Sequence, residues 1–164
     1  MAQVVSGGVD TMDFEYDGLH RRIQKVDNGS STTGYYYNEQ WQCILESEGT
    51  GGSEAAKVVY IWRPHYVDAL AVRMRADEDD EHFFTHDANF NVTAAVEEAT
   101  GDPMVERYAY TPYGEATYLE ENYDVATAQV SAIGNEHLYT GRRTDPETGL
   151  QLNRYRYYHQ QLGR

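Results

Sequence analysis

The sequence has few of the residues that usually stabilise a small domain. It holds one cysteine among 164 residues, so an internal disulfide is excluded. Val, Ile, Leu and Phe together number 29, under a fifth of the chain, and the formal net charge is -14. Such a composition is typical of disorder. The 15 tyrosines and two tryptophans change this expectation, because large amphipathic rings bury area that the aliphatic residues do not supply.

Basic residues and long apolar runs are scarce as well. The chain has 13 Lys and Arg against 27 Asp and Glu, and its pI is about 4.7. We therefore expect no nucleic-acid partner, because phosphates require a basic surface, and no anionic membrane surface. No run of roughly 18 apolar residues is present, so no membrane span is predicted. Residues 1–10 lack a basic segment followed by an apolar one, and a signal peptide is not expected.

What the chain does contain is a series of short alternating runs, each closed by turn residues. Asp17-Gly18 and Asp27-Asn28-Gly29 are strong hairpin signals, and Gly101-Asp102 marks a later turn. Strands are predicted at 13–16, 19–26, 33–37, 41–46, 57–62, 66–73, 81–86, 92–98 and 104–110. Loops are predicted at 47–54 and at the acidic run 77–81, and a short helix or loop at 123–133. The pattern predicts an all-β fold of successive antiparallel β-hairpins.

The last stretch, residues 139–164, also reads as a hairpin. Asp145 can cap a turn, Pro146 sets φ for its first central position, and Gly149 can take a positive φ. The return strand is predicted to run from 150 to 159 with side chains alternating between two faces. One face would carry Leu150, Leu152, Arg154, Arg156 and Tyr158, and the other Gln151, Asn153, Tyr155, Tyr157 and His159.

Several motifs occur together in one order. They are Tyr16-Asp17-Gly18, Asp87-Ala88-Asn89, Tyr110-Thr111-Pro112-Tyr113-Gly114, Tyr139-Thr140-Gly141-Arg142, Asp145-Pro146-Glu147-Thr148-Gly149-Leu150, Arg154-Tyr155-Arg156-Tyr157-Tyr158 and Leu162-Gly163-Arg164. In this order the chain resembles the C-terminal part of RHS/YD-repeat proteins, with their RHS repeat-associated core domain. Tyr37-Asn38 stands about one repeat after Tyr16-Asp17, with Asn in place of Asp. Repeats of this kind stack on their neighbours.

The resemblance implies a fold and a function. The fold would be an extended curved sheet of the YD-repeat shell type, with repeat hairpins over 1–56 and the RHS core over 57–164, truncated before its closing segment. The function would be that of a non-catalytic structural part of a bacterial shell that encloses and helps deliver a C-terminal polymorphic toxin. Its partners would be the remaining repeats and the toxin domain of the same polypeptide. The location would be secreted or at the cell surface.

Two alternatives to a shell segment stay open. One is a cell-surface or secreted carbohydrate-binding or adhesion module, in which tyrosine rings stack on sugars. Its candidate contacts are Tyr155 and Tyr157, together with Tyr35 and Tyr37, although cross-strand packing also explains these tyrosines. The other is a truncated gene remnant with no role of its own.

No catalytic residue, metal site or cofactor is predicted. Asp87, Asn89, Asn91 and Glu98 have EF-hand spacing, but Val92 stands where that loop requires Gly. His82 and His86 have zinc-ligand spacing for a helix, yet on the predicted strand they would lie about 13 Å apart. Some RHS cores contain an aspartyl autoprotease, but its second Asp-Pro-x-Gly segment is absent, so Asp145 is interpreted as a turn former. Cys43 is expected to be a buried structural thiol.

Overall fold

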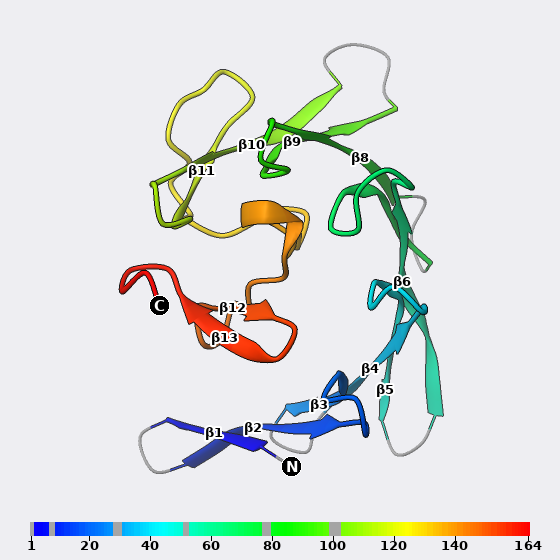
Figure 1. Cartoon of the computed structure of the whole chain (residues 1–164). Coiled ribbons are helices and arrows are strands. Elements are labelled where there is room, and N and C mark those ends of the chain that lie inside the picture. Colours follow the sequence, from blue (N-terminus) through cyan, green and yellow to red (C-terminus); the bar gives the residue numbers. More distant parts are fainter. Residues whose placement is uncertain (1, 7–8, 28–30, 51–52, 77–79, 99–102) are drawn as a thin grey trace. The chain divides into compact units, whose positions relative to one another are not determined.

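The computed structural model describes residues 2–6, 9–27, 31–50, 53–76, 80–98 and 103–164 (Figure 1). Within these residues, eleven strands form one sheet in chain order, and a second sheet has two strands. The first sheet comprises β1 (Ala2–Ser6), β2 (Val9–Tyr16), β3 (Arg22–Asp27), β4 (Ser31–Tyr37), β5 (Cys43–Thr50), β6 (Ser53–Trp62), β7 (Leu70–Arg75), β8 (Asp80–His86), β9 (Val92–Glu97), β10 (Met104–Tyr110) and β11 (Ala116–Leu119). The second pairs β12 (Leu150–Asn153) with β13 (Arg156–His159), and a 3-10 turn, η1, spans Tyr139–Gly141. The predicted all-β fold of successive antiparallel hairpins is confirmed.

The chain divides into two compact units. The first comprises Met1–Tyr60 and Met74–Asp80, and the second comprises Ile61–Arg73 and Glu81–Arg164. Within each unit, consecutive strands pair antiparallel, β1 to β6 in the first and β8 to β11 in the second. In the part of the chain that the structure describes, no helix has the length and hydropathy that a bilayer crossing needs.

The core of the first unit contains aromatic rings packed around a buried arginine, where many small domains have a cluster of aliphatic side chains. Arg22 on β3 is 1% exposed, and its guanidinium lies 5.0 Å from the ring centroids of both Phe14 and Tyr35. Tyr60 is buried as well and donates a 2.9 Å hydrogen bond to Glu46 Oε1. This packing shows how a chain poor in aliphatic residues forms a core. Cys43 is buried, as expected.

One five-residue turn recurs along the chain and connects the strand pairs β2–β3, β4–β5, β8–β9 and β10–β11. Its first N–H donates to the carbonyl of the fifth residue, and its fourth N–H donates to the carbonyl of the first. In the described part it occurs at 17–21, 38–42, 87–91, 111–115, 120–124 and 138–142. The fourth residue always has a positive φ, and it is His20, Trp41, Phe90 or Tyr123 in four of the turns and Gly114 or Gly141 in the other two.

In three of these turns the side chain of the first residue accepts two backbone hydrogen bonds within the turn. Asp17, Asn38 and Asp87 each accept hydrogen bonds at 2.8 to 3.0 Å from the N–H groups two and four residues later. A non-glycine residue at positive φ costs about 1–2 kcal/mol, and these two bonds help to fix it there. The resemblance of Tyr37-Asn38 to Tyr16-Asp17 therefore has a structural basis, because Asn accepts the same two bonds as Asp.

Replacing Asp87 by Ala tests the role of the first turn residue. Asp87 Oδ2 also accepts a 2.7 Å hydrogen bond from Asn91 Nδ2, so three bonds would be lost. We expect Asp87→Ala to lower the free energy of unfolding by about 1–2 kcal/mol, as for loss of a helix cap. Urea unfolding would measure it, with the exposed Asn89→Ala as the matched control. Equal stability of the two variants would contradict this role.

Two sequence predictions about strands were wrong. Residues 47–50 and 53–54, predicted as loop, extend β5 and β6, with Ser47 opposite Ala56 and Thr50 opposite Ser53. Gly49 permits this pairing, because a Cβ there would lie 2.1 Å from the Ser53 carbonyl oxygen. Residues 66–69 form a turn instead of the start of a strand, with the Ala69 N–H donating to the Tyr66 carbonyl at 3.2 Å.

The predicted return strand from 150 to 159 is also not one strand. It turns back at Arg154, which has a φ of 53°, so that β12 pairs with β13. The two alternating faces predicted for this stretch therefore do not exist as such. In the preceding turn Gly149 has the expected positive φ, 65°, and its N–H donates to the Asp145 backbone carbonyl at 2.8 Å. Residues 123–133 lack a helix, and the predicted turns at 28–29 and 101–102 and most of the acidic run lie outside the described residues.

Candidate functional site

The motif tyrosines of the second unit bond backbone carbonyls. The hydroxyl of Tyr110 donates to the Val92 carbonyl at 2.6 Å, and that of Tyr139 donates to the Pro112 carbonyl at 3.2 Å. The hydroxyl of Tyr158 donates to the Tyr113 carbonyl at 3.0 Å. These bonds join segments 18 to 45 residues apart in the chain.

Asp68 forms ion pairs with two arginines of the C-terminal motifs, a role that was missed by sequence reasoning. Its carboxylate lies 3.1 Å from Arg142 and 3.1 Å from Arg154, and its backbone carbonyl approaches Gly141 so closely that a Cβ there would lie 1.7 Å away. The motif residues Gly141, Arg142 and Arg154 therefore surround one acidic residue that lies 86 positions before Arg154. No local pattern at Asp68 signals this role.

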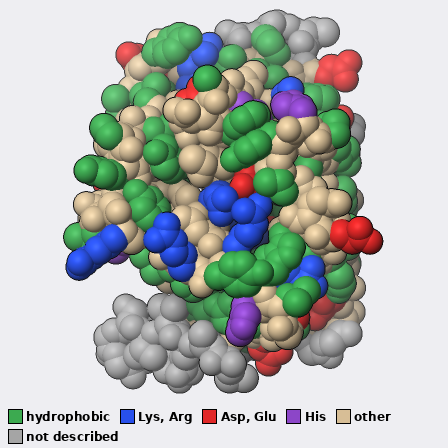
Figure 2. Space-filling model, viewed as in Figure 1, with side chains coloured by type: hydrophobic (Ala, Val, Ile, Leu, Met, Phe, Trp, Pro, Cys, Tyr) green, Lys and Arg blue, Asp and Glu red, His purple; other side chains and the backbone are tan. Residues whose placement is uncertain are grey.

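A shallow polar pocket lies beside these arginines. It has a volume of about 340 Å³ and is lined by Tyr139, Thr140, Arg142, Gln151, Asn153, Arg156 and Tyr158. Figure 2 shows Lys and Arg side chains gathered on the viewed face over the part of the chain that carries β12 and β13 in Figure 1. Motif residues and basic side chains, among them Arg142 and Arg156, therefore line the same pocket.

A second cluster centres on Glu106, in the middle of β10. Glu106 is 5% exposed, and its Oε1 accepts hydrogen bonds from the hydroxyls of Tyr108 and Ser131. Its Oε2 accepts a 2.8 Å bond from the Ala132 N–H. Asn135 extends the network by donating from Nδ2 to the Tyr108 hydroxyl at 3.1 Å. The buried carboxylate therefore fixes the segment 131–135 to β10.

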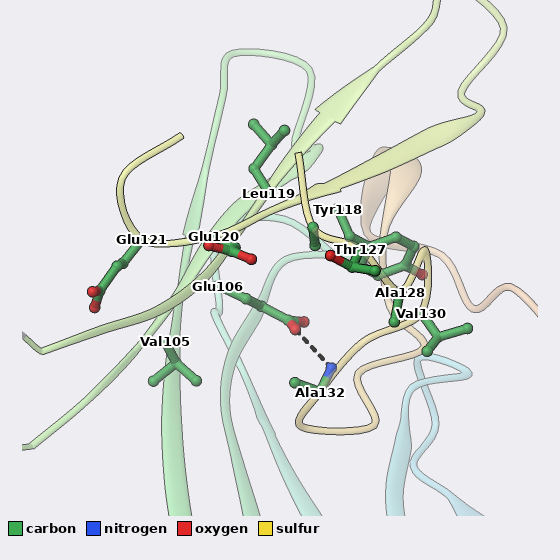
Figure 3. Close-up of a pocket in the computed structure, with 11 residues that line it drawn as sticks. Val105, Glu106, Tyr118, Leu119, Glu120, Glu121, Thr127, Ala128, Val130 and Ala132 are labelled. Carbon is green, nitrogen blue, oxygen red and sulfur yellow. Dashed lines mark hydrogen bonds between the residues drawn. The ribbon is translucent and has the colours of Figure 1, made fainter. Parts of the chain in front are cut away.

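This carboxylate faces a pocket of about 450 Å³ (Figure 3). The pocket is lined by Val105, Glu106, Tyr118, Leu119, Glu120, Glu121, Ala126, Thr127, Ala128, Val130 and Ala132. Sequence reasoning did not single out Glu106. Its inward position could have been found from the alternation of β10, where Glu106 and Tyr108 are both buried and the intervening Arg107 is not.

The tyrosines around Glu106 are held in their neutral form. Burial, followed by the charge of Glu106, raises the pKa of Tyr108 well above its ordinary value of 10. Burial and then the same charge raise the pKa of Tyr118 to about 12. Burial also raises the pKa of Tyr110. These hydroxyls are consequently hydrogen-bond donors over the whole physiological range and not bases.

The residues considered for metal binding have other roles. Asp87 and Asn91 bond to each other within a turn, and Asn91 Oδ1 accepts a 2.8 Å bond from the Thr140 N–H. His82 and His86 both lie on β8, as predicted, and His82 is buried. Among the residues that the structure describes, no three His, Cys, Asp or Glu side chains are grouped to hold a metal ion.

His86 gives the second unit a pH dependence. Burial, and then the positive charge of Arg63, lowers its pKa from 6.5 to about 4, although Asp87 acts in the opposite sense. The unfolded chain therefore binds this proton at a higher pH than the folded chain does. Stability should fall as pH is lowered from about 6.5 toward 4.

Because His86 is only partly buried, we expect a loss of about 1 kcal/mol between pH 7 and pH 5. Urea unfolding at the two pH values measures it. In His86→Gln this difference should shrink, whereas the exposed His20→Gln should keep it. An unchanged pH profile in His86→Gln would show that another group is responsible.

The tyrosines proposed to stack on sugars differ in exposure. Tyr155 lies at the β12–β13 turn and is 73% exposed, and Tyr157 on β13 is 38% exposed. Tyr35 is only 3% exposed, so its ring is not accessible to a ligand. Tyr37 is half-buried, and its hydroxyl donates to the Arg22 carbonyl at 2.8 Å.

Comparison with known proteins identifies the fold. No family model matches the sequence, and no curated protein matches it. Among solved structures, a crystal structure of TcdB2-TccC3 matches all of this chain with a TM-score of 0.66 at 19% identity. The Photorhabdus luminescens Tc holotoxin pore matches 98% of the chain with a TM-score of 0.63 at 19% identity. TcdB2-TccC3 without its hypervariable C-terminal region matches 100% with a TM-score of 0.62 at 20% identity.

In each case this chain spans 8% of the length of the chain that it matches. These identities show the fold, and they confirm in fold the RHS/YD-repeat resemblance found in the sequence.

Proposed function

We propose that this chain is a non-catalytic structural segment of an RHS/YD-repeat shell that encloses a C-terminal toxin and helps to deliver it. The observation that carries the proposal is the match of the whole chain to TcdB2-TccC3, a Tc toxin assembly. Since the chain spans 8% of that protein, the shell would be completed by further repeats, and the toxin domain would belong to the same polypeptide. Such an assembly would be secreted or displayed at the cell surface.

The roles of the motif residues support a structural function. Asp17 and Asp87 hold turns through their side chains, and Tyr110, Tyr139 and Tyr158 bond backbone carbonyls. Residues of this kind fix hairpins next to one another, as a repeat shell requires. We propose 1–56 as repeat hairpins and 57–164 as the core part of such a shell.

Limited proteolysis of the product of the complete reading frame tests enclosure. An enclosed C-terminal domain should resist protease while the shell is folded and become sensitive once urea opens the shell. The same domain expressed without the shell should be cleaved from the start. Cleavage at equal rates with and without a folded shell would rule out enclosure.

The carbohydrate-binding alternative rests on Tyr155, whose exposure at a turn suits ring stacking. A glycan array would detect it as saturable binding that is lost in Tyr155→Ala and in Tyr157→Ala. Tyr123→Ala is the control, because Tyr123 is also exposed but lies in a different turn. Loss of binding in the control as well would mean that the signal is not specific to the β12–β13 turn.

A further inference from the structure

Glu106 is a buried carboxylate whose hydrogen-bond partners are all neutral. They are the Tyr108 and Ser131 hydroxyls and the Ala132 N–H. Among the residues that the structure describes, no lysine, arginine or histidine pairs with it. The adjacent Arg107 lies elsewhere, with its guanidinium 4.1 Å from the centroid of the Tyr123 ring and its Nε donating to the Glu121 carbonyl at 3.0 Å. Burying a carboxylate without a counter-charge is costly.

The carboxylate also keeps a free acceptor position. A carboxylate offers about four lone-pair sites, and the three bonds to Glu106 use two sites on Oε1 and one on Oε2. Oε2 can therefore accept one more donor from the side of the pocket. Its present partner, the Ala132 N–H, is part of the pocket wall (Figure 3).

The pocket has the Glu106 carboxylate at its bottom and apolar side chains along its walls. Val105, Leu119, Ala126, Ala128 and Val130 supply apolar side chains to its wall, and the lining contains no lysine or arginine. Glu120 and Glu121 line the same pocket and add two further carboxylates. At about 450 Å³ the pocket is within the range of ligand sites and has room for one long side chain.

We propose that this pocket binds a lysine or arginine side chain of a partner peptide, with its cation at Glu106 and its stem against the apolar wall. Long basic side chains combine an apolar stem with a charged tip, which matches the distribution of apolar and acidic groups here. The cation supplies the counter-charge that Glu106 lacks, in a site where a charge-assisted bond is stronger than in water. The net charge of -14 favours the approach of a basic segment. This inference does not depend on the proposed shell function.

The test uses three blocked peptides and the complete chain. Acetyl-Ala-Lys-Ala-amide and acetyl-Ala-Arg-Ala-amide are titrated against the protein while the Ala132 amide resonance is followed by NMR. Acetyl-Ala-norleucine-Ala-amide has a similar stem but no charge. We expect the basic peptides to shift the Ala132 resonance saturably and to bind at least tenfold more tightly than the norleucine peptide. Equal binding of the basic and norleucine peptides would overturn the proposal, and so would equally tight binding of methylammonium, which has no stem.

Two variants locate the site independently. Ala128→Phe fills the pocket from an exposed wall position and leaves Glu106 in place, so it should weaken binding at least tenfold. Glu106→Gln should do the same by removing the charge. Glu39→Gln removes the same charge from an exposed turn and should leave the affinity unchanged. Should Glu106→Gln fail to fold, Ala128→Phe still decides, because undiminished binding to that variant would place the peptide elsewhere.

Discussion

Replacing Gly141 by Ala is expected to lower the free energy of unfolding of the second unit by more than about 4 kcal/mol, a loss that few single substitutions cause. Gly141 has a φ of 67°, and a Cβ there would lie 1.7 Å from the backbone carbonyl oxygen of Asp68. That oxygen cannot move aside alone, because the Asp68 side chain is held by Arg142 and Arg154. The added methyl group would therefore push Gly141 away from Asp68 and disrupt the ion pairs of Asp68 with Arg142 and Arg154.

Substitutions at two other glycines distinguish the cost of the positive φ from the cost of the close contact with Asp68. Gly149 has a φ of 65°, but a Cβ there would meet no atom within 4 Å, so Gly149→Ala should cost only the backbone strain of about 1–2 kcal/mol. Gly18 has neither a positive φ nor a close neighbour, and Gly18→Ala should be nearly neutral.

Urea unfolding of the three variants, followed by far-ultraviolet circular dichroism, gives the order. Gly141→Ala should be the least stable, then Gly149→Ala, then Gly18→Ala. If Gly141→Ala were no less stable than Gly149→Ala, the close approach to Asp68 would contribute nothing.

The hairpin architecture could be predicted because its signals are local. Asp17-Gly18 and the alternating runs on either side of it identify one hairpin without any distant contact. The recurring five-residue turn was harder to predict from sequence, since Trp41 and Phe90 are not residues that normally suggest a positive φ. Their conformation follows from the bonds that Asn38 and Asp87 accept, a pattern that depends on the first residue of the turn and not on the fourth.

The errors arose where contacts between strands or segments, and not residue preferences, decide the local structure. The alternation from Leu150 to His159 is compatible with one strand, yet Arg154 pairs with Asp68 and takes a positive φ there. Similarly, a run rich in Gly and Ser at 47–54 suggests a loop, but Gly49 lets the β6 backbone come close. The contact of Arg154 joins residues 86 positions apart, which no local window connects. Gly49 and Ser53 are close in the chain, but Gly and Ser favour a loop by residue preference and so conceal the pairing.

The Glu106 cluster could be predicted from sequence only in part. Its inward direction follows from strand alternation in β10, whereas its partners Ser131 and Ala132 come from a segment without regular structure 25 or 26 residues later. A buried acidic residue on an otherwise aromatic face signals a partner, but it does not say which partner. The inward position of Glu106 on its strand could therefore be predicted from sequence, whereas the hydrogen bonds from Ser131 and Ala132 could not.

Replacing Glu106 by Ala is the second substitution with a large expected effect. It removes the acceptor of the Tyr108 and Ser131 hydroxyls and of the Ala132 N–H, while Asn135 Nδ2 remains a donor to Tyr108. Each buried donor left without an acceptor costs about 1–3 kcal/mol. We expect a loss of about 3 kcal/mol in the free energy of unfolding, which urea unfolding would measure, and Glu120→Ala at an exposed position of the same pocket is the control.

Tyrosine ionisation gives a second readout that a general loss of packing would not produce. The charge of Glu106 contributes, after burial, to the raised pKa of Tyr108 and to the value of about 12 for Tyr118. In Glu106→Gln, which keeps the volume and removes the charge, both tyrosines should ionise at a lower pH. The absorbance at about 295 nm during an alkaline titration would show this as an earlier rise. A Tyr118 pKa that stayed at about 12 in Glu106→Gln would mean that burial and the charge of Glu136 determine it, and that the Glu106 carboxylate does not act on this ring.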